Sequence, residues 1–134
     1  MTHTNASAYL PGVHNINRRE AIYRRRVGYV ALLVFITLLV VFLAFSRLLW
    51  WRTLLVLPAF VSALGFLQAR YHFCVMYASK GKQNAAENST QPTTITSEAA
   101  LEKDRHKVLV MNLQAALWAI GATLLSLLLP SLGG

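Results

Sequence analysis

The side chains able to do chemistry gather in one short stretch of this 134-residue chain, residues 68–80. The stretch holds the single cysteine, Cys74, and one of the four histidines, His72. On a helix, two residues that are two positions apart point in different directions, so this pair is poorly placed to bind one ion. A structural zinc site also needs four ligands, and the sequence offers no second cysteine. We therefore predict no metal site.

Cys74 is the better candidate for chemistry, as the reactive thiol of a redox or sulfur-relay protein. Arg70 precedes it by four residues, so on a helix the arginine charge would lie one turn away and lower the pKa of the thiol. The simpler interpretation is a small apolar side chain at an interface, because cysteine is among the most buried residue types. We favour the simpler interpretation and keep Cys74 as the one candidate reactive residue.

The rest of the sequence lacks the signatures of the common enzyme classes. It contains no glycine-rich phosphate loop, no serine elbow and no HExxH zinc motif. The net charge of +8 would suit nucleic acid, but no recognition motif accompanies it, and only 13% of residues are charged against roughly 25% in an average soluble domain. We therefore predict a chain without catalytic residues, cofactor or nucleic-acid partner. A bound lipid, quinone or pigment stays open.

Three apolar blocks supply the elements that must position these residues. Residues 27–46 carry no charge, and 20 residues of helix span roughly 30 Å, the thickness of the hydrocarbon core of a bilayer. The other blocks are residues 53–73, where Pro58 predicts a kink, and residues 108–132. In lipid a segment must satisfy its own backbone polar groups. The sequence therefore predicts an all-α integral membrane protein with three transmembrane helices.

The polar segments around these blocks predict the domain organisation. Residues 1–26 form a basic arm, residues 27–80 a helical hairpin, residues 81–107 a polar linker with a short helix, and residues 108–134 the third span with a short tail. A cleaved signal peptide is the alternative for the first block. We reject it because a 20-residue apolar region behind a 26-residue arm is longer than such peptides carry.

The distribution of positive charge predicts the orientation. With a cytoplasmic N-terminus, eleven Lys and Arg residues face the cytoplasm and two face the other side. Membrane proteins keep their Lys and Arg residues on the cytoplasmic side. We therefore expect a multi-pass protein of the plasma (inner) membrane, with its N-terminus in the cytoplasm and its C-terminus outside.

Residues suited to the membrane surface flank the first block. Arginine side chains extend from apolar surroundings to water, and tryptophan rings favour the level of the lipid headgroups. Arg47 and Arg52 on either side of two tryptophans thus predict a turn at the interface, with both arginines reaching water. The residues expected at the lipid surface or on an acidic partner are Arg18, Arg19, Arg24, Arg25, Arg26, Trp50 and Trp51.

Small residues line one face of the second and third blocks, whereas Leu, Val, Ile and Phe cover every side of the first. Helices associate in lipid through small residues and a few polar contacts. We therefore expect the first helix to be a lipid-facing anchor, and the other two to pack against each other or against a larger complex. The expected contact residues are Ser62, Gly65, Ala69, Asn112, Ala116, Ala119 and Thr123.

Residues 27–84 also carry a short pattern of motifs. It comprises a Trp-Arg turn, Leu57-Pro-Ala-Phe, Gly65-Phe-Leu-Gln, Phe73-Cys-Val, and Tyr77 followed by Gly81. This resembles the YgaP-like small inner-membrane domains, in which a helical hairpin ends in a Gly-Phe, Phe-Cys-Pro, Tyr and Gly pattern. Some members are fused to or found beside rhodanese sulfurtransferase domains. Here Val75 replaces the proline, no second cysteine follows and a third helix is added, so the resemblance implies a membrane hairpin and only remotely a sulfur role.

Together these features predict a small non-catalytic integral membrane protein. Its expected role is that of an accessory, anchoring or assembly subunit of a larger membrane complex, energy-converting complexes being one class. The lipid bilayer and other integral membrane subunits are the expected partners. Two alternatives remain: a redox or sulfur-relay protein that uses Cys74, and a homo-oligomer that associates through its own helices.

Overall fold

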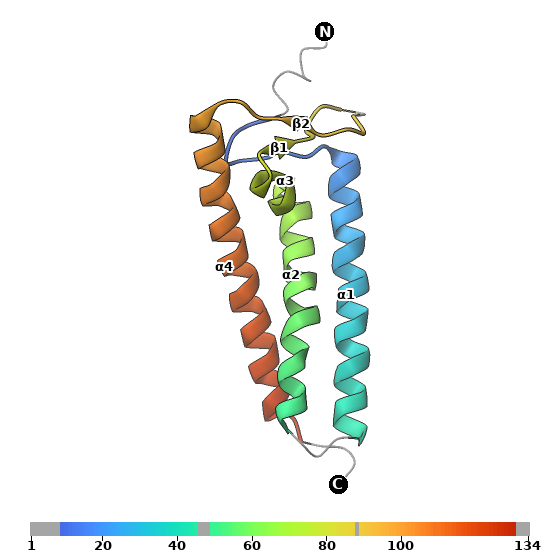
Figure 1. Ribbon diagram of the computed structural model, residues 1–134. Helices are drawn as coiled ribbons and strands as arrows, with labels where there is room; N and C mark the ends of the chain where they lie inside the picture. Colours follow the sequence, from blue (N-terminus) through green and yellow to red (C-terminus); the bar gives the residue numbers. More distant parts are fainter. Residues whose placement is uncertain (1–8, 46–48, 88, 131–134) are drawn as a thin grey trace.

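Three long helices run side by side in the computed structural model, which describes residues 9–45, 49–87 and 89–130 (Figure 1). The second helix lies between the other two. A short 3-10 helix leads into it from the first. The four elements are α1 (Arg18–Phe45), η2 (Leu49–Leu55), α2 (Val56–Tyr71) and α4 (Glu98–Leu128).

The helical character predicted for the chain is confirmed. Three helical segments are long and apolar enough to cross a membrane, judged by length and composition: α1, residues Trp50–Tyr71, and α4. Some predicted features lie outside the described residues, namely Arg47 of the expected turn and the ends of the first and third spans at residues 46 and 131–132.

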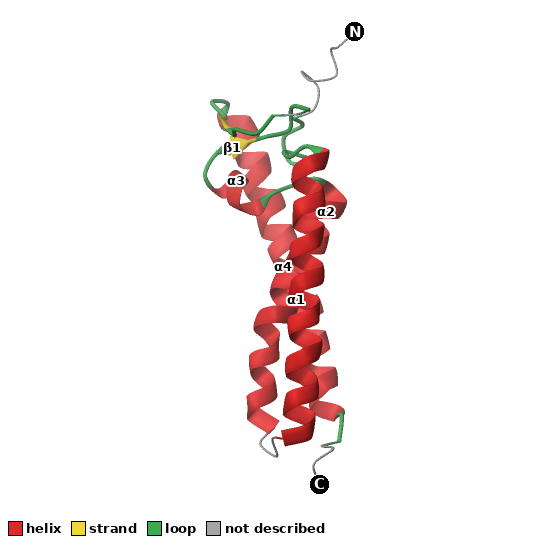
Figure 2. Cartoon of the chain, turned by 90° about the vertical axis from the view of Figure 1, so that its right-hand side faces the viewer, coloured by secondary structure: helices red, strands yellow, loops and turns green. Residues whose placement is uncertain are grey.

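The segment between α2 and α4, which includes the polar part of the predicted linker, contains short elements of regular structure. It forms the short helix α3 (Val75–Ser79) and two strands, β1 (Lys82–Gln83) and β2 (Thr93–Thr94), which pair antiparallel. These elements gather at one end of the bundle (Figure 2). Residues 9–17 join them there, through a parallel bridge between Ile16 and Asn84. We call this end the polar end.

Side-chain caps explain where the two outer helices begin. Asn17 Oδ1 accepts a hydrogen bond of 3.0 Å from the backbone N–H of Glu20, so α1 starts well before the apolar block. Ser97 Oγ accepts one of 3.3 Å from Ala100 N at the start of α4. The short helix predicted at residues 98–107 is continuous with the third span, because no helix breaker separates them.

The second span differs from the prediction at both of its ends. Residues 49–55 wind as a 3-10 helix, and Pro58 lies in the first turn of α2 rather than kinking its interior. The helix ends at Tyr71 because His72 adopts the left-handed conformation, with φ 52° and ψ 47°, and donates its N–H to Gln68 O. Cys74 therefore follows the helix instead of lying on it.

The first helix is packed closely against α2, which corrects its description as a purely lipid-facing anchor. A Cβ at Gly65 would lie 2.8 Å from the backbone nitrogen of Gly28 in α1, so the two backbones almost touch. Ser62 Oγ donates a 2.9 Å hydrogen bond to Gly28 O. The rings of Tyr29 and Phe66 meet edge to face, with centroids 4.9 Å apart. The small residues Ser62 and Gly65 of α2 thus pack against α1.

The third long helix packs on the other side of α2 (Figure 1). From Met111 onward its buried side chains recur every three or four residues, as expected for one face of a helix. Asn112 and Ala116, expected on this face, are only half-buried, because the face runs one residue earlier in this part of the helix. The buried residues of its membrane-length part are Met111, Ala115, Ala119, Thr123 and Ser126.

Candidate functional site

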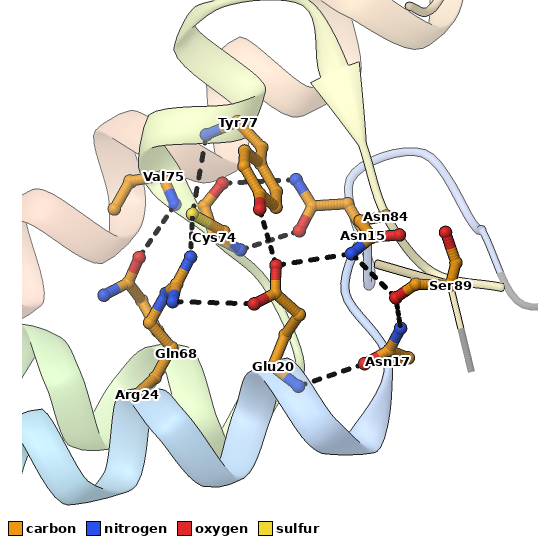
Figure 3. A network of polar contacts seen from close by, with 10 residues as sticks. All are labelled: Asn15, Asn17, Glu20, Arg24, Gln68, Cys74, Val75, Tyr77, Asn84 and Ser89. Atoms are coloured by element: carbon orange, nitrogen blue, oxygen red, sulfur yellow. Dashed lines mark hydrogen bonds and ion pairs between the residues drawn. The ribbon is translucent and has the colours of Figure 1, made fainter. Parts of the chain in front are cut away.

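Polar side chains from five segments meet at the polar end (Figure 3). The segments are the residues before α1, the first turns of α1, the last turns of α2, the start of α3 and the residues after β1. We call this group the polar cluster. Its members are Asn15, Asn17, Glu20, Arg24, Gln68, Cys74, Tyr77 and Asn84, joined by backbone groups of Val75 and Ser89.

Cys74 lies at the centre of the polar cluster and is 1% exposed. Its Sγ accepts a hydrogen bond of 3.1 Å from Arg24 Nη2 and one of 3.5 Å from the backbone N–H of Tyr77, so the thiol caps α3. The arginine beside the sulfur is therefore not the predicted Arg70, which is exposed and separated from Cys74 by the end of α2. The sulfur is enclosed by its own chain.

Asn15 links the N-terminal segment to Cys74 through both of its amide atoms. Asn15 Oδ1 accepts from Cys74 N at 2.7 Å, and Asn15 Nδ2 donates to Cys74 O at 3.2 Å. The backbone adds bonds from Asn15 N and Ile16 N to His72 O, at 2.9 and 3.1 Å. Asn84 N donates to Asn15 O at 2.8 Å, so residues before α1 lie between the loop after α2 and the residues after β1.

Glu20 supplies the acid of the polar cluster. Its Oε2 accepts a 2.6 Å hydrogen bond from the Tyr77 hydroxyl and one of 3.4 Å from Asn84 Nδ2, and its Oε1 lies 4.0 Å from Arg24 Nη1. Burial, together with the hydrogen bond to Glu20, raises the pKa of Tyr77 to about 12. The phenol therefore keeps its proton at neutral pH and acts as a hydrogen-bond donor to the carboxylate.

A second acidic residue attaches the N-terminal segment to α4. Asp104 is fully buried and accepts hydrogen bonds from the Tyr9 hydroxyl, at 2.8 Å, and from Gly12 N, at 2.7 Å. Gly12 has φ of 72°, a conformation that glycine adopts without strain. Burial raises the pKa of Tyr9, and the hydrogen bond to Asp104 raises it further. The sequence carried no signal for this contact, because its partners are about ninety residues apart.

Arg52 lies at the opposite end of the bundle and is 1% exposed, which corrects the expectation that it reaches water. Its Nη1 donates to the carbonyl oxygens of Ser126, at 2.7 Å, and Leu129, at 2.6 Å. A cation at the C-terminus of a helix is stabilised by the unpaired carbonyls and the helix dipole. Arg52 therefore caps the C-terminal end of α4 by binding its free carbonyl oxygens. Trp50 and Trp51 stack beside it, with ring centroids 4.5 Å apart.

The structure separates the predicted surface residues into two kinds. Arg24 turns inward to Cys74, while the other four arginines of its group are exposed at the polar end: Arg18, Arg19, Arg25 and Arg26. Trp50 and Trp51 are exposed by 58% and 38%. Of the predicted packing residues, five are buried: Ser62, Gly65, Ala69, Ala119 and Thr123.

The polar cluster connects segments of the chain that are distant in sequence. The Cys74 thiol accepts from the Arg24 guanidinium, and the Tyr77 phenol donates to the Glu20 carboxylate, so both contacts join α1 to the residues after α2. Among the described residues, no group of three or more His, Cys, Asp and Glu side chains is placed to hold a metal ion. The resemblance to YgaP-like domains stays a prediction based on its short motifs, since no family model, curated protein or solved structure has a significant match to this chain.

Proposed function

We propose that this chain is a small, non-catalytic, three-span protein of the plasma (inner) membrane that serves as an accessory, anchoring or assembly subunit of a larger membrane complex. One observation carries the proposal. The chemically versatile side chains hold the chain's own segments together, while the outer faces of the helices stay apolar and without a partner in the chain. We therefore expect the protein to act by binding other subunits through its outer faces rather than by catalysing a reaction.

The outer faces support insertion in a bilayer. Leu33 of α1 is 64% exposed, and Leu117 and Trp118 of α4 are each 70% exposed, as members of long series of exposed apolar residues. A soluble monomer rarely leaves so much contiguous apolar surface in water. The exposed arginines gather at the polar end, which the positive-inside bias assigns to the cytoplasm.

Purification from native membranes in mild detergent tests the accessory role. We expect the tagged protein to retain larger integral membrane subunits in fixed stoichiometry, identified by mass spectrometry. A photo-crosslinking residue at Leu117 or Leu33, on outer faces, should capture the same subunits, whereas one at the fully buried Ala115 should not. Recovery of this chain alone, or crosslinks only to lipid or to further copies of the chain, would refute the proposal.

The alternative is a redox or sulfur-relay protein, favoured by the Arg24 guanidinium 3.1 Å from Cys74 Sγ. A nearby cation stabilises a thiolate. Cys74→Ser separates the two functions, because a serine oxygen also accepts the bond that caps α3. If the protein is an accessory subunit, this variant should keep its fold and assemble with its partners as before. A relay should lose both its activity and any persulfide or disulfide adduct on this residue.

A further inference from the structure

An apolar groove runs along α2 between α1 and α4. Its volume is about 440 Å³, within the range of about 300 to 1,000 Å³ that small-molecule sites occupy. Phe35 of α1 and Trp118 of α4 form parts of its two walls. Its floor follows one face of α2 from Ala59, through Ala63, to Arg70. The groove is thus partly open and is bounded by residues of all three long helices.

The length of the groove matches one leaflet of a bilayer. Ala59 and Arg70 are eleven residues apart, which is about 16 Å along a helix. Half of a hydrocarbon core is about 15 Å thick. Arg70 is exposed in the last turns of α2 at the polar end, where α2 gives way to the polar cluster. An alkyl chain seated in the groove would therefore extend from headgroup level to the middle of the bilayer.

A positive charge at one end of the groove favours a lipid with an anionic headgroup. Arg70 is the one charged residue among the described residues that line it, and it forms no ion pair with any described residue. An arginine guanidinium binds phosphate through charge-assisted hydrogen bonds. A single cation at the membrane surface favours an anionic lipid by about fivefold. The groove therefore combines an apolar track with a cation at the end nearest the membrane surface.

We propose that this groove binds one acyl chain of an anionic phospholipid from the leaflet at the polar end, with Arg70 on its headgroup. The inference rests on the membrane insertion proposed above, but not on the accessory role. The lipid would fill the space between α1 and α4 that the small side chains of α2 leave open, and would be held there longer than the surrounding lipids.

Fluorescence quenching by lipids with brominated acyl chains tests the proposal on the full chain. Trp50→Phe and Trp51→Phe leave Trp118, on the groove wall, as the single tryptophan. The protein is reconstituted in phosphatidylcholine vesicles that contain a small fraction of brominated phosphatidylglycerol or brominated phosphatidylcholine. We expect the anionic lipid to reach half-maximal quenching at about a fivefold lower fraction. Arg70→Gln should remove this preference.

Two further variants, built on the same background, sharpen the test. Arg25→Gln removes an exposed arginine that does not line the groove and should keep the preference. Ala63→Phe should fill the groove and lower quenching by the anionic lipid, with helix content checked by circular dichroism. Equal quenching by both lipids, or loss of the preference in Arg25→Gln as much as in Arg70→Gln, would overturn the groove proposal. Absence of quenching by either lipid would refute membrane insertion itself.

Discussion

Alanine at position 65 would place a methyl group against the backbone of α1. The new Cβ would lie 2.8 Å from Gly28 N, 2.9 Å from Gly28 Cα and 3.0 Å from Arg24 O. These are backbone atoms, which cannot rotate away, so the two helices must separate. Overpacking of this kind costs about 1 to 3 kcal/mol.

Two smaller terms adjust that value. Separation of the helices weakens the hydrogen bond from Ser62 to Gly28 O, a loss of about 0.6 kcal/mol for an average interhelical bond in a membrane protein. The better helix propensity of alanine returns about 0.5 to 1 kcal/mol. These two terms nearly cancel, so we expect Gly65→Ala to lower the free energy of unfolding by about 1 to 3 kcal/mol.

Two other glycines provide matched controls. A Cβ at Gly121, on the outer face of α4, meets no atom within 4 Å, so Gly121→Ala should be neutral or slightly stabilising. A Cβ at Gly28 would meet the Phe66 ring at 3.0 Å, and because this ring is a side chain that can shift, the loss should be intermediate. Unfolding in mixed micelles, followed by far-UV circular dichroism, gives the three values. A Gly65→Ala protein as stable as Gly121→Ala would refute the close approach of α1 and α2.

Three further predictions use the same unfolding assay. Arg52→Gln should lower the free energy of unfolding by about 2 to 3 kcal/mol, because α4 loses the buried cation at its last carbonyls, whereas the exposed Arg25→Gln should be neutral. Because the pKa of Tyr77 rises from 10.0 in the unfolded chain to about 12 in the fold, its contribution to stability should be full below pH 10 and fall as the pH rises from 10 to 12. Tyr77→Phe should reduce this fall, and an unchanged profile would contradict the buried phenol. Cys74, at 1% exposure, should react with a water-soluble thiol reagent only as fast as the polar end opens, and immediate labelling of the folded protein would disprove its enclosure.

The long helices could be predicted because their signal is local. An uncharged block of sufficient length specifies a helix whatever the rest of the chain does, and the caps at Asn17 and Ser97 only move the starting points. Asn17 with Glu20 three residues later is itself a capping signature that the sequence displays. The partner of each helix was harder to predict. The face of small residues on α2 can be recognised in the sequence, but nothing in the sequence shows that Gly65 meets α1 rather than α4.

The polar end could not be predicted, because its contacts join residues that are far apart. Asn15 and Cys74 are 59 positions apart, and Tyr9 and Asp104 are 95. Neither Asn15 nor Asp104 lies in a local motif, so each resembled an ordinary solvated residue. The burial of Arg52 is hidden from the sequence for the same reason, since its acceptors belong to the end of α4. Polar residues in these positions are buried by tertiary contacts, which composition and periodicity do not reveal.

The bonds from Asn15 and Ile16 to His72 O also impose an order on biosynthesis. Ile16 leaves the ribosome 56 residues before His72, an interval of about 3 to 11 seconds at ordinary rates of translation. All of α1 is synthesised within this interval, while the segment before it has no native partner. The segment can dock only after the chain has passed through α2 and returned to the same end. Closure of the polar end therefore requires that α1 and α2 are both complete and that α2 runs back toward the start of α1.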